Sequence, residues 1–516
     1  MGMFQLSDKS KWLIAASVFA VSVGPTLVSY QPYVFRWDDS GYLGQCIAVS
    51  RAFWWGSAHG VAHLREIMAA TNSIRPPMMT LLGLPWGQLT SWDAAGKCFL
   101  TLAVLQSFFA SLCLFLLARI GLKPIFLVLA SICAFASFGP LPQGATSHHL
   151  ATAFLADGLF AWIALAALLL IPYESRTHNR SIKHAFLRGV LWGVTLSAGA
   201  MTKISFFYFV SLIAPVLLVI RLRHGGRRGM LAAIIGLACA TAPAAAYLVK
   251  YGRASFVNGG ESSFGGVANF YSVPLFQFLI DSLRHSPGIA VFVTYSAASL
   301  GYLLIRRRAL VREPDFLALL IASGFGMIVM ASVNREIRFS FPAILALPFL
   351  LGVLLSAKGA PVPRISAVLA SCLVFCGLTG AAFPTRHRAE RQASLGRSDA
   401  VILQATKCDD KNILLATDSP TLNQELLGVA VSISRSTSPI EFDSLAYRSM
   451  SGLPIGSDYR VMQNSDLIVF QDDQELSPQF TNVRVPEYKR FISEHDEYVP
   501  FEVGDDVTAY SRYCRP

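Results

Sequence analysis

The sequence predicts an α-helical polytopic membrane protein that ends in a C-terminal extracytoplasmic α/β domain. Hydrophobic residues make up 53% of the 516 residues and charged residues only 15%, with a mean hydropathy of +0.48, whereas a soluble globular protein carries about 25% charged residues. The charge is also divided: residues 1–385 carry a formal net charge of +17 and residues 386–516 carry −6. A soluble enzyme is therefore excluded. Because the bases punctuate apolar runs and do not cover one soluble face, we expect no nucleic-acid partner.

The transmembrane domain is expected over residues 1–385, with about eleven helices. A bilayer crossing needs about 20 mostly apolar residues. Eleven runs of this kind occur, at 12–34, 97–118, 124–141, 149–172, 186–202, 204–220, 230–250, 288–305, 315–333, 339–357 and 365–384. The first is longer than the h-region of a signal peptide, which has about 7–15 residues, so we expect it to remain as an anchor in the lipid bilayer.

The orientation follows from the Lys and Arg residues, because short cytoplasmic loops carry an excess of them. With a cytoplasmic N-terminus, eighteen of the 29 bases in residues 1–385 fall in inside segments, among them Arg176, Arg188 and Arg221. An odd number of spans then places the tail outside. We therefore expect a multi-pass protein of the inner or plasma membrane with a periplasmic C-terminal domain.

Three segments are expected on the outer face: a first loop over 35–96, a loop over 251–287 and the tail. The first loop contains two amphipathic stretches, 40–56 and 60–71, whose tryptophans suit the headgroup level. The Gly-rich run 258–266 fits simple flexibility better than a phosphate cradle, since no strand and no Lys-Ser/Thr accompany it. A mobile lid is the other interpretation of this run.

The tail, residues 386–516, is expected to form one small α/β domain. Its pattern predicts helices over 389–406, 420–430, 443–450 and 486–494, strands over 412–417 and 466–471, and a final hairpin over 498–503 and 507–512. It contains no recognisable catalytic motif. Cys408 and Cys514 are its only cysteines, and in an oxidising compartment we expect them to pair.

Acidic residues are scarce in residues 1–385, and two of them, Asp38 and Asp39, stand together where the first span leaves the membrane. They fit two interpretations equally well. One is a solvated helix cap beside Arg36, and the other is a general base that takes a proton from an acceptor hydroxyl.

Further charged residues fall on the expected outer face. Asp157 lies nine residues after His148, so a continuous helix would carry it about 13 Å into the fourth span, where an ionisable group usually faces a polar cavity. Lys203, in a short outer hairpin, runs against the positive-inside trend, and its alternative is a snorkelling helix end. Arg335, Glu336 and Arg338 precede the tenth span, where an isolated ion pair would mean little.

Taken together, the acids and cations at one membrane face suit sugar transfer from a lipid-linked phosphate. Lys and Arg side chains would neutralise the departing phosphate, and a carboxylate would deprotonate the incoming hydroxyl. The same cations could instead bind a transported anion, so a secondary transporter with an appended domain is the alternative. Transporters usually show repeated halves and ionisable groups near the bilayer midplane. The hydropathy of this chain shows no repeat, and its charges gather at one membrane face. A non-catalytic scaffold would not explain Asp157.

Five segments resemble the GT-C superfamily, and specifically its polyprenyl-phosphate-sugar-dependent group, which includes protein O-mannosyltransferases and the lipid A aminoarabinose transferase. RWDDSGY (36–42) resembles the group's first-loop acidic motif, and SIRPPMM (73–79) its His-Pro-Pro segment. ATAFLADGLF (151–160) resembles the fourth-span motif, AMTKISF (200–206) the Thr-Lys hairpin, and NREIRFSFP (334–342) the start of a late span. Asp39 replaces the usual Glu, Arg75 the usual His and Phe339 the usual Tyr.

The resemblance implies an inverting glycosyltransferase that moves a monosaccharide from a polyprenyl-phosphate donor to a hydroxyl of an envelope glycan, lipid or protein. Asp38 would be the base and Asp39 its neighbour. The residues implied to hold the donor phosphate are Lys203, Arg338, Arg75 and Arg335. Those implied to position the sugar or a cation are Asp157, His148, His149, Tyr42 and Glu336. The resemblance assigns no cofactor and leaves the need for a divalent cation open, and no metal ligands are assigned.

Overall fold

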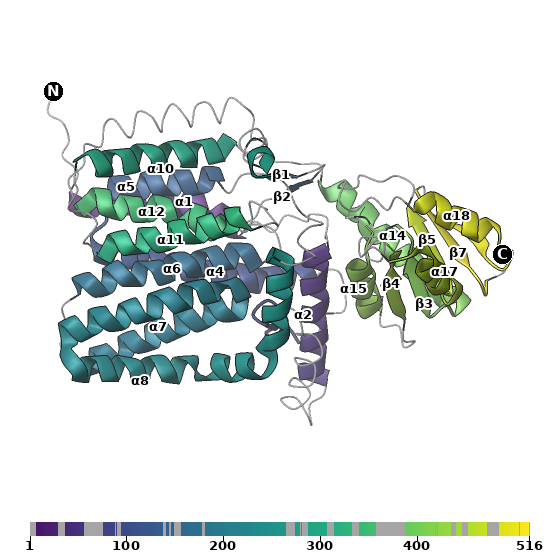
Figure 1. The fold of residues 1–516 in the computed structure, drawn as a ribbon, viewed down its shortest axis with the longest axis horizontal. Helices are drawn as coiled ribbons and strands as arrows, with labels where there is room; N and C mark the ends of the chain where they lie inside the picture. Colours follow the sequence, from purple (N-terminus) through teal and green to yellow (C-terminus); the bar gives the residue numbers. More distant parts are fainter. Residues whose placement is uncertain are drawn as a thin grey trace.

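The structure is a computed structural model of the full chain. It describes residues 7–28, 37–55, 76–87, 89, 94–137, 141–143, 146–148, 156–177, 181–264, 274–278, 280, 287–306, 314–332, 340–357, 387–417, 419, 422–434, 440–445, 453–471, 484–504 and 506–514. Figure 1 shows two parts: a bundle of long helices, and a mixed sheet with helices, residues 387–514, which we call the C-terminal body.

The bundle helices coincide with the predicted spans from 12–34 to 339–357. They are α1 (Asp8–Val28), α4 (Ala94–Ile120), α5 (Pro124–Ser137), α6 (Ala156–Arg176), α7 (Ile182–Thr202), α8 (Phe207–Phe264), α10 (Pro287–Arg306), α11 (Pro314–Ala331) and α12 (Phe341–Ala357). The span at 365–384 lies outside the described residues, so the count of eleven stays a prediction. By length and composition, four described helices could cross a membrane: Gly96–Ile120, Ala156–Arg176, Ile204–Lys250 and Pro314–Ala331.

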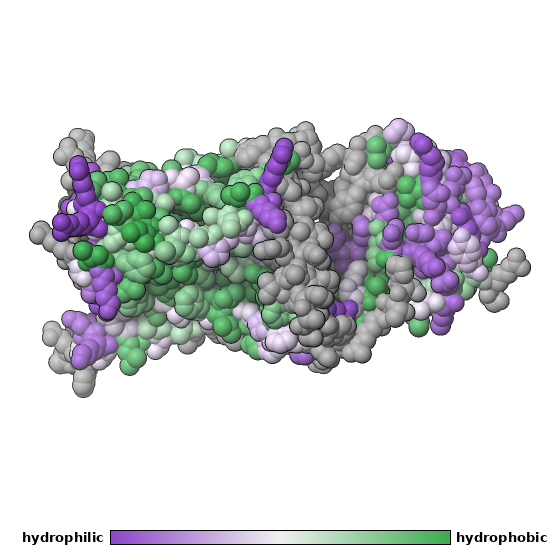
Figure 2. All heavy atoms as spheres, turned by 90° about the horizontal axis from the view of Figure 1, so that it is seen from below, coloured by the Kyte–Doolittle hydropathy of each residue, from purple (hydrophilic) through white to green (hydrophobic). Residues whose placement is uncertain are grey.

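The centre of the bundle is α6, which is buried along nearly its whole length. Helices α4, α7, α8, α11 and α12 all pack against it. Its Phe160 ring meets the rings of Phe206, Phe209 and Phe325 edge to face. The outer helices expose large apolar side chains such as Phe108 and Leu231. Figure 2 shows this apolar surface between a hydrophilic left end and the hydrophilic C-terminal body, which is the surface that a bilayer covers.

The two predicted spans 204–220 and 230–250 are the two limbs of α8. They meet at Gly226, whose φ of 63° reverses the chain, a conformation that glycine adopts without steric cost. The second limb lies directly on α7: a Cβ on Gly236 would lie 2.2 Å from the Phe186 carbonyl oxygen, and one on Gly189 would lie 2.1 Å from the Ala233 carbonyl oxygen. Small residues therefore allow this close helix contact.

The helices alternate in direction, so the bundle has two distinct ends. At the end facing the C-terminal body, which we call the proximal end, α6 begins at Ala156, α7 ends at Thr202 and α12 begins at Phe341 (Figure 1). At the opposite, distal end, α4 ends at Ile120 and α6 ends at Arg176. The bends at the proximal end are those predicted to lie outside, and the distal bends are those predicted to lie inside.

Ion pairs between helices lie at the distal end. Glu174 of α6 accepts hydrogen bonds from Arg188 of α7 at 3.0 Å and from Arg221 of α8 at 3.3 Å, and all three side chains are at most 9% exposed. Nearby, Arg176 pairs with Asp315 of α11 and donates to the carbonyl of Ile120 at the end of α4. These contacts tie the distal ends of five helices together.

The first outer loop supplies α2 (Trp37–Trp55) and the short 3₁₀ helix η1 (Thr80–Gly83). Helix α2 corresponds to the predicted stretch 40–56 but begins three residues earlier, so Asp38 and Asp39 lie within its first turn, where the helix dipole favours carboxylates. It runs across the proximal end in Figure 1. The stretch 60–71 lies outside the described residues. The prediction that the chain is already a loop from residue 251 is wrong, because α8 continues as a helix to Phe264 and includes the Gly-rich run up to that residue; only its last two residues lie outside the described ones.

The C-terminal body is built on a five-stranded sheet in the order β4-β3-β5-β7-β6. The strands are β3 (Asn412–Leu415), β4 (Glu441–Ser444), β5 (Leu467–Gln471), β6 (Val499–Gly504) and β7 (Val507–Ser511). Strands β4, β3 and β5 are parallel, and β7 and β6 complete the sheet antiparallel. One face packs against α14 (His387–Cys408) and α15 (Gln424–Ser434), and the other against α17 (Ile455–Gln463) and α18 (Val485–Ser493).

Two local predictions for the tail are corrected. The expected helix over 443–450 is wrong at its start, because residues 441–444 form β4, which pairs with β3. Helix α17 was missed altogether. Both elements are short and polar, and pairing with a distant strand or packing on the sheet stabilises them more than local propensity does.

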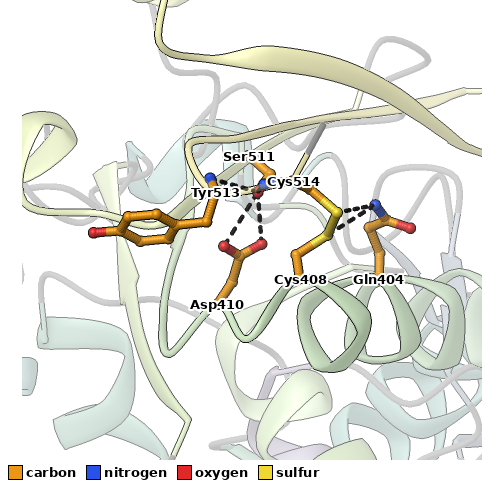
Figure 3. Close-up of a disulfide and its surroundings, with 6 residues drawn as sticks. All are labelled: Gln404, Cys408, Asp410, Ser511, Tyr513 and Cys514. Atoms are coloured by element: carbon orange, nitrogen blue, oxygen red, sulfur yellow. Dashed lines mark hydrogen bonds between the residues drawn. A yellow bond between two sulfur atoms is a disulfide. The ribbon is translucent and has the colours of Figure 1, made fainter. Parts of the chain in front are cut away.

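A disulfide closes the C-terminal body, between Cys408 at the end of α14 and Cys514 beyond β7, the pairing expected from the sequence. Figure 3 shows the bond beside Gln404 and a buried cluster around Ser511. The Ser511 hydroxyl donates to Asp410 at 2.9 Å and accepts from the backbone N–H of Cys514 at 3.2 Å. The cross-link encloses a long segment, and in the chain-entropy account such a loop stabilises the folded state by about 3–5 kcal/mol.

Candidate active site

Asp157 lies at the proximal end of the bundle, in the first turn of α6. The prediction that it lies about 13 Å down a continuous fourth span is wrong, because His148 belongs to the short strand β2 (Thr146–His148), which pairs with β1 (Leu141–Gln143), and α6 begins only at Ala156. The Asp157 side chain is 5% exposed. A carboxylate in the first turn interacts favourably with the helix dipole, so the helix accommodates this charge near its entrance and not at mid-depth.

Lys203 pairs with Asp157, and this ion pair is the core of the candidate site. Lys203 ends α7 in an extended conformation, and its backbone N–H donates to the Gly199 carbonyl at 3.0 Å. Its ammonium group contacts the Asp157 carboxylate and lies 5.8 Å from the centroid of the Phe160 ring. The Lys203 side chain is 23% exposed. It is therefore directed toward α6 and has an ionic partner, which a snorkelling helix end does not need.

The first outer loop is attached to the same turn of the chain. The Met78 N–H donates to the Met201 carbonyl at 2.9 Å, two residues before Lys203. Met78 follows the Pro76-Pro77 pair of the His-Pro-Pro-like segment. Two of the five motif segments, far apart in sequence, are thus joined by a backbone hydrogen bond.

Helix α2 is clamped onto this loop by side chains on one of its faces. Cys46 donates to the Met79 carbonyl at 2.8 Å, Ser50 to the Trp86 carbonyl at 2.5 Å and Trp54 to the Leu84 carbonyl at 2.8 Å. The backbones also approach closely, since a Cβ on Gly83 would lie 2.4 Å from the Cys46 carbonyl oxygen. The acid-bearing helix, the loop and the Lys203 turn therefore form one connected unit.

No sequence pattern predicted these contacts between α2 and the loop. The available signal was the spacing of Cys46, Ser50 and Trp54, three hydrogen-bond donors four residues apart, which places them on one helix face. The carbonyl partners, however, belong to a segment that no pattern in α2 identifies.

Several predicted site residues are described only in part. Asp38 and Asp39 lie on the α2 backbone, His148 lies in β2, and Tyr42 is partly buried against the bundle core. Five others lie outside the described residues: Arg75, His149, Arg335, Glu336 and Arg338. Arg75 directly precedes the described Pro76, and the last three residues fall between α11 and α12 in the chain, whose facing ends, Ala331 and Phe341, lie at the proximal end. Within the described ranges, no group of three or more His, Cys, Asp or Glu side chains could hold a metal ion.

Comparison with solved structures supports the sequence resemblance. The chain is similar to ArnT from Cupriavidus metallidurans in the apo state, with a TM-score of 0.55, 14% sequence identity and coverage of 98% of each chain. ArnT bound to undecaprenyl phosphate gives a TM-score of 0.49 at 13% identity, covering 98% of this chain and 97% of the other. The oligosaccharyltransferase AglB from Archaeoglobus fulgidus, with an inhibitory peptide and a dolichol-phosphate, gives 0.48 at 12%, covering 90% and 69%.

The first of these likenesses establishes the fold: the chain has the fold of ArnT from Cupriavidus metallidurans. The fold that the sequence resemblance implied is therefore observed. No protein-family model matches the chain, and no curated protein matches it in sequence.

Proposed function

We propose that the protein is an inverting glycosyltransferase that moves a monosaccharide from a polyprenyl-phosphate donor to a hydroxyl of an envelope glycan, lipid or protein at the outer membrane face. The observation that carries the proposal is the Lys203–Asp157 pair at the proximal end. The Met78–Met201 hydrogen bond joins this pair to the first outer loop, on which α2 packs. The GT-C-like fold supports the same reaction class.

In the proposed reaction the acceptor oxygen bonds to the anomeric carbon as the bond from that carbon to the phosphate oxygen breaks. Attack from the opposite face inverts the anomer, and the bonding electrons leave with the polyprenyl phosphate. Asp38 takes the proton of the acceptor hydroxyl, as a positioned general base does. Asp39 orients the Asp38 carboxylate or the bound ligand. Lys203, with Arg338, Arg75 and Arg335, neutralises the phosphate, because fixed cations stabilise charge that develops on a leaving group.

Asp157 has a defined part in this scheme. Its carboxylate holds the Lys203 ammonium group near the start of α6, so the cation is already oriented before the donor arrives. A donor phosphate would then share Lys203 with Asp157, and the sugar would lie toward Asp157, Tyr42, His148, His149 and Glu336. Preorganised charge of this kind costs no reorganisation during the reaction.

The placement of the buried charges favours a transferase over a transporter. In the described part of the bundle, the buried ionisable residues lie toward one end of the bundle or the other: Asp157, Glu174, Arg188, Arg221 and Asp315. Secondary transporters instead hold substrate and coupling-ion groups near the bilayer midplane.

The decisive experiment is turnover by the purified full-length protein in lipid nanodiscs with labelled polyprenyl-phosphate sugars and envelope extracts as acceptors. We expect label to move from the donor lipid to a product, with release of polyprenyl phosphate. Transport of an anion into proteoliposomes, without any loss of label from the donor lipids, would favour the transporter and contradict the proposal.

A further inference from the structure

The C-terminal body touches the acid-bearing helix directly, through α15. Helix α15 lies beside α2 in Figure 1 and packs against it. Leu426 and Val429, both fully buried, belong to the same apolar cluster as Leu43 and Ile47 of α2. The approach is close, since a Cβ on Gly44 would lie 3.4 Å from the Val429 Cγ2 atom.

Helix α15 is apolar on two faces, and this is why it can bridge the two parts of the chain. Leu426, Val429 and Ile433 contribute to the cluster shared with the bundle, whereas the neighbouring Leu427 and Ala430 belong to the core against the sheet. A helix that only covered a sheet would need one apolar stripe. The second stripe is occupied by α2.

The two halves of α2 are held by different partners. The side-chain bonds to the first outer loop come from Cys46, Ser50 and Trp54, in its C-terminal half. The Gly44–Val429 contact lies in the N-terminal half, five residues from Asp39 and so about 7.5 Å along the helix axis. The half that carries Asp38 and Asp39 therefore packs against α15, in addition to the contact of Tyr42 with the bundle core.

We propose that Leu426 and Val429 are positioning residues: α15 of the C-terminal body fixes the N-terminal half of α2, and with it the carboxylates of the active site. The proposal rests on the proposed function for its catalytic consequence, because Asp38 is taken as the base. It gives the C-terminal body a role in the reaction without requiring a catalytic residue in it. A shift of about 1 Å in a reacting group is enough to cost up to about 10²-fold in rate.

The adjacent leucines of α15 provide a matched pair of variants. Leu426→Ala and Leu427→Ala make the same truncation at two fully buried sites, the first on the α2 face and the second on the sheet face. Amide hydrogen exchange of the full-length protein reports the effect independently of activity. We expect Leu426→Ala to speed exchange in residues 37–44 of α2 and leave residues 46–55 unchanged, and we expect Leu427→Ala to change neither segment.

Turnover then tests the catalytic consequence. Leu426→Ala should lower kcat about tenfold or more, with donor affinity unchanged because Lys203 lies on other elements, whereas Leu427→Ala should keep kcat within about twofold of the parent. Variants at Gly44 control for simple misfolding. Gly44→Leu should push α15 away from α2 and lower kcat, whereas Gly44→Ala should be tolerated, because its Cβ would lie at a contact distance of 3.4 Å. Val429→Ala, combined with Gly44→Leu, should restore part of the lost activity.

Equal effects of the two leucine variants on exchange and on kcat would overturn the inference, as would failure of Val429→Ala to rescue a folded Gly44→Leu protein. A parent protein that turns over no donor would instead refute the proposed function. In that case the exchange pattern alone decides whether α15 holds the N-terminal half of α2.

Discussion

The two ends of the helical bundle use charge in different ways. At the distal end, Glu174 is shared by two arginines in a buried cluster, and Arg176 is paired with Asp315. At the proximal end, Lys203 pairs with Asp157 and is 23% exposed, beside the elements that carry the other predicted site residues. The side chains of the Glu174 cluster are at most 9% exposed and tie helices together, whereas Lys203 lies beside a loop, where we propose that it binds a ligand. We therefore propose a structural role for the Glu174 cluster and a functional role for the Lys203–Asp157 pair.

The largest expected effect concerns which side of the membrane each end of the bundle faces, because a topology reporter gives an all-or-none signal. Residue 225 lies beside the distal kink of α8, and residue 400 lies in α14 of the C-terminal body. A topology reporter fused after residue 225 should read cytoplasmic, and one fused after residue 400 should read extracytoplasmic. Matching signals from both positions would contradict the two-sided arrangement.

Removal of the proposed base should have the next largest effect. Asp38→Asn preserves size but removes the basic lone pair, so turnover should fall by about 10²–10⁴-fold with donor binding nearly intact. Asp39→Asn is the matched variant in the same turn of α2 and should slow turnover less. If Asp39→Asn abolishes turnover and Asp38→Asn does not, the assignment is reversed; two fully active variants would exclude the acid pair from the mechanism.

The distal cluster should affect stability and not donor binding. Glu174→Gln leaves Arg188 and Arg221 buried without their shared carboxylate, and breaking a buried pair in this way costs about 3–5 kcal/mol. Thermal unfolding of the purified protein should show the loss, while the dissociation constant of the polyprenyl-phosphate donor stays at the parent value. A large fall in donor affinity at unchanged stability would mean that the distal end also binds ligand.

The smallest expected effect lies in the C-terminal body and depends on pH. Burial raises the pKa of Asp410 to about 7, with the Asp466 and Asp409 carboxylates adding to the increase and the Ser511 hydrogen bond opposing it. An unfolded Asp has a pKa of about 3.9, so between about pH 4 and 7 the folded state retains a proton that the unfolded state has lost. The free energy of unfolding should therefore fall as the pH rises through this range.

Asp410→Asn keeps the neutral form at every pH, so it should flatten this dependence in thermal unfolding of the full-length protein at pH 5 and pH 8. Asp409→Asn, at the exposed neighbouring position, is the control and should preserve most of it, because the Asp409 carboxylate is the smallest contribution to the raised pKa of Asp410. An unchanged slope in Asp410→Asn would assign the dependence to another group.

The sequence was sufficient for the features that depend on composition along the chain. Apolar runs predicted the positions of the bundle helices, and the Lys and Arg pattern assigned the bends between them to two different ends. The Cys408–Cys514 pairing followed from the lack of other thiols in the tail. These features are local or cumulative, so no knowledge of distant contacts was required.

The features that the sequence did not predict depend on contacts between distant segments. Arg188 and Arg221 counted as loop bases because their sequence neighbourhoods are basic, and only the helix packing brings both to Glu174. Asp157 was placed too deep because the strand at His148 was not recognised. The second apolar face of α15 was also not distinguished from an ordinary core face, since its partner α2 is encoded almost 400 residues earlier.

The central claim is that Lys203 binds the donor phosphate, and donor affinity measured in two variants tests it most directly. Lys203→Met keeps the apolar stem and removes the charge, which should weaken donor binding by about 1.5–3 kcal/mol. The double variant Lys203→Met/Asp157→Asn also removes the carboxylate that the first change leaves unpaired. The account predicts weak donor binding in both. Parent-like affinity in the single variant, or recovery of affinity in the double variant, would contradict it.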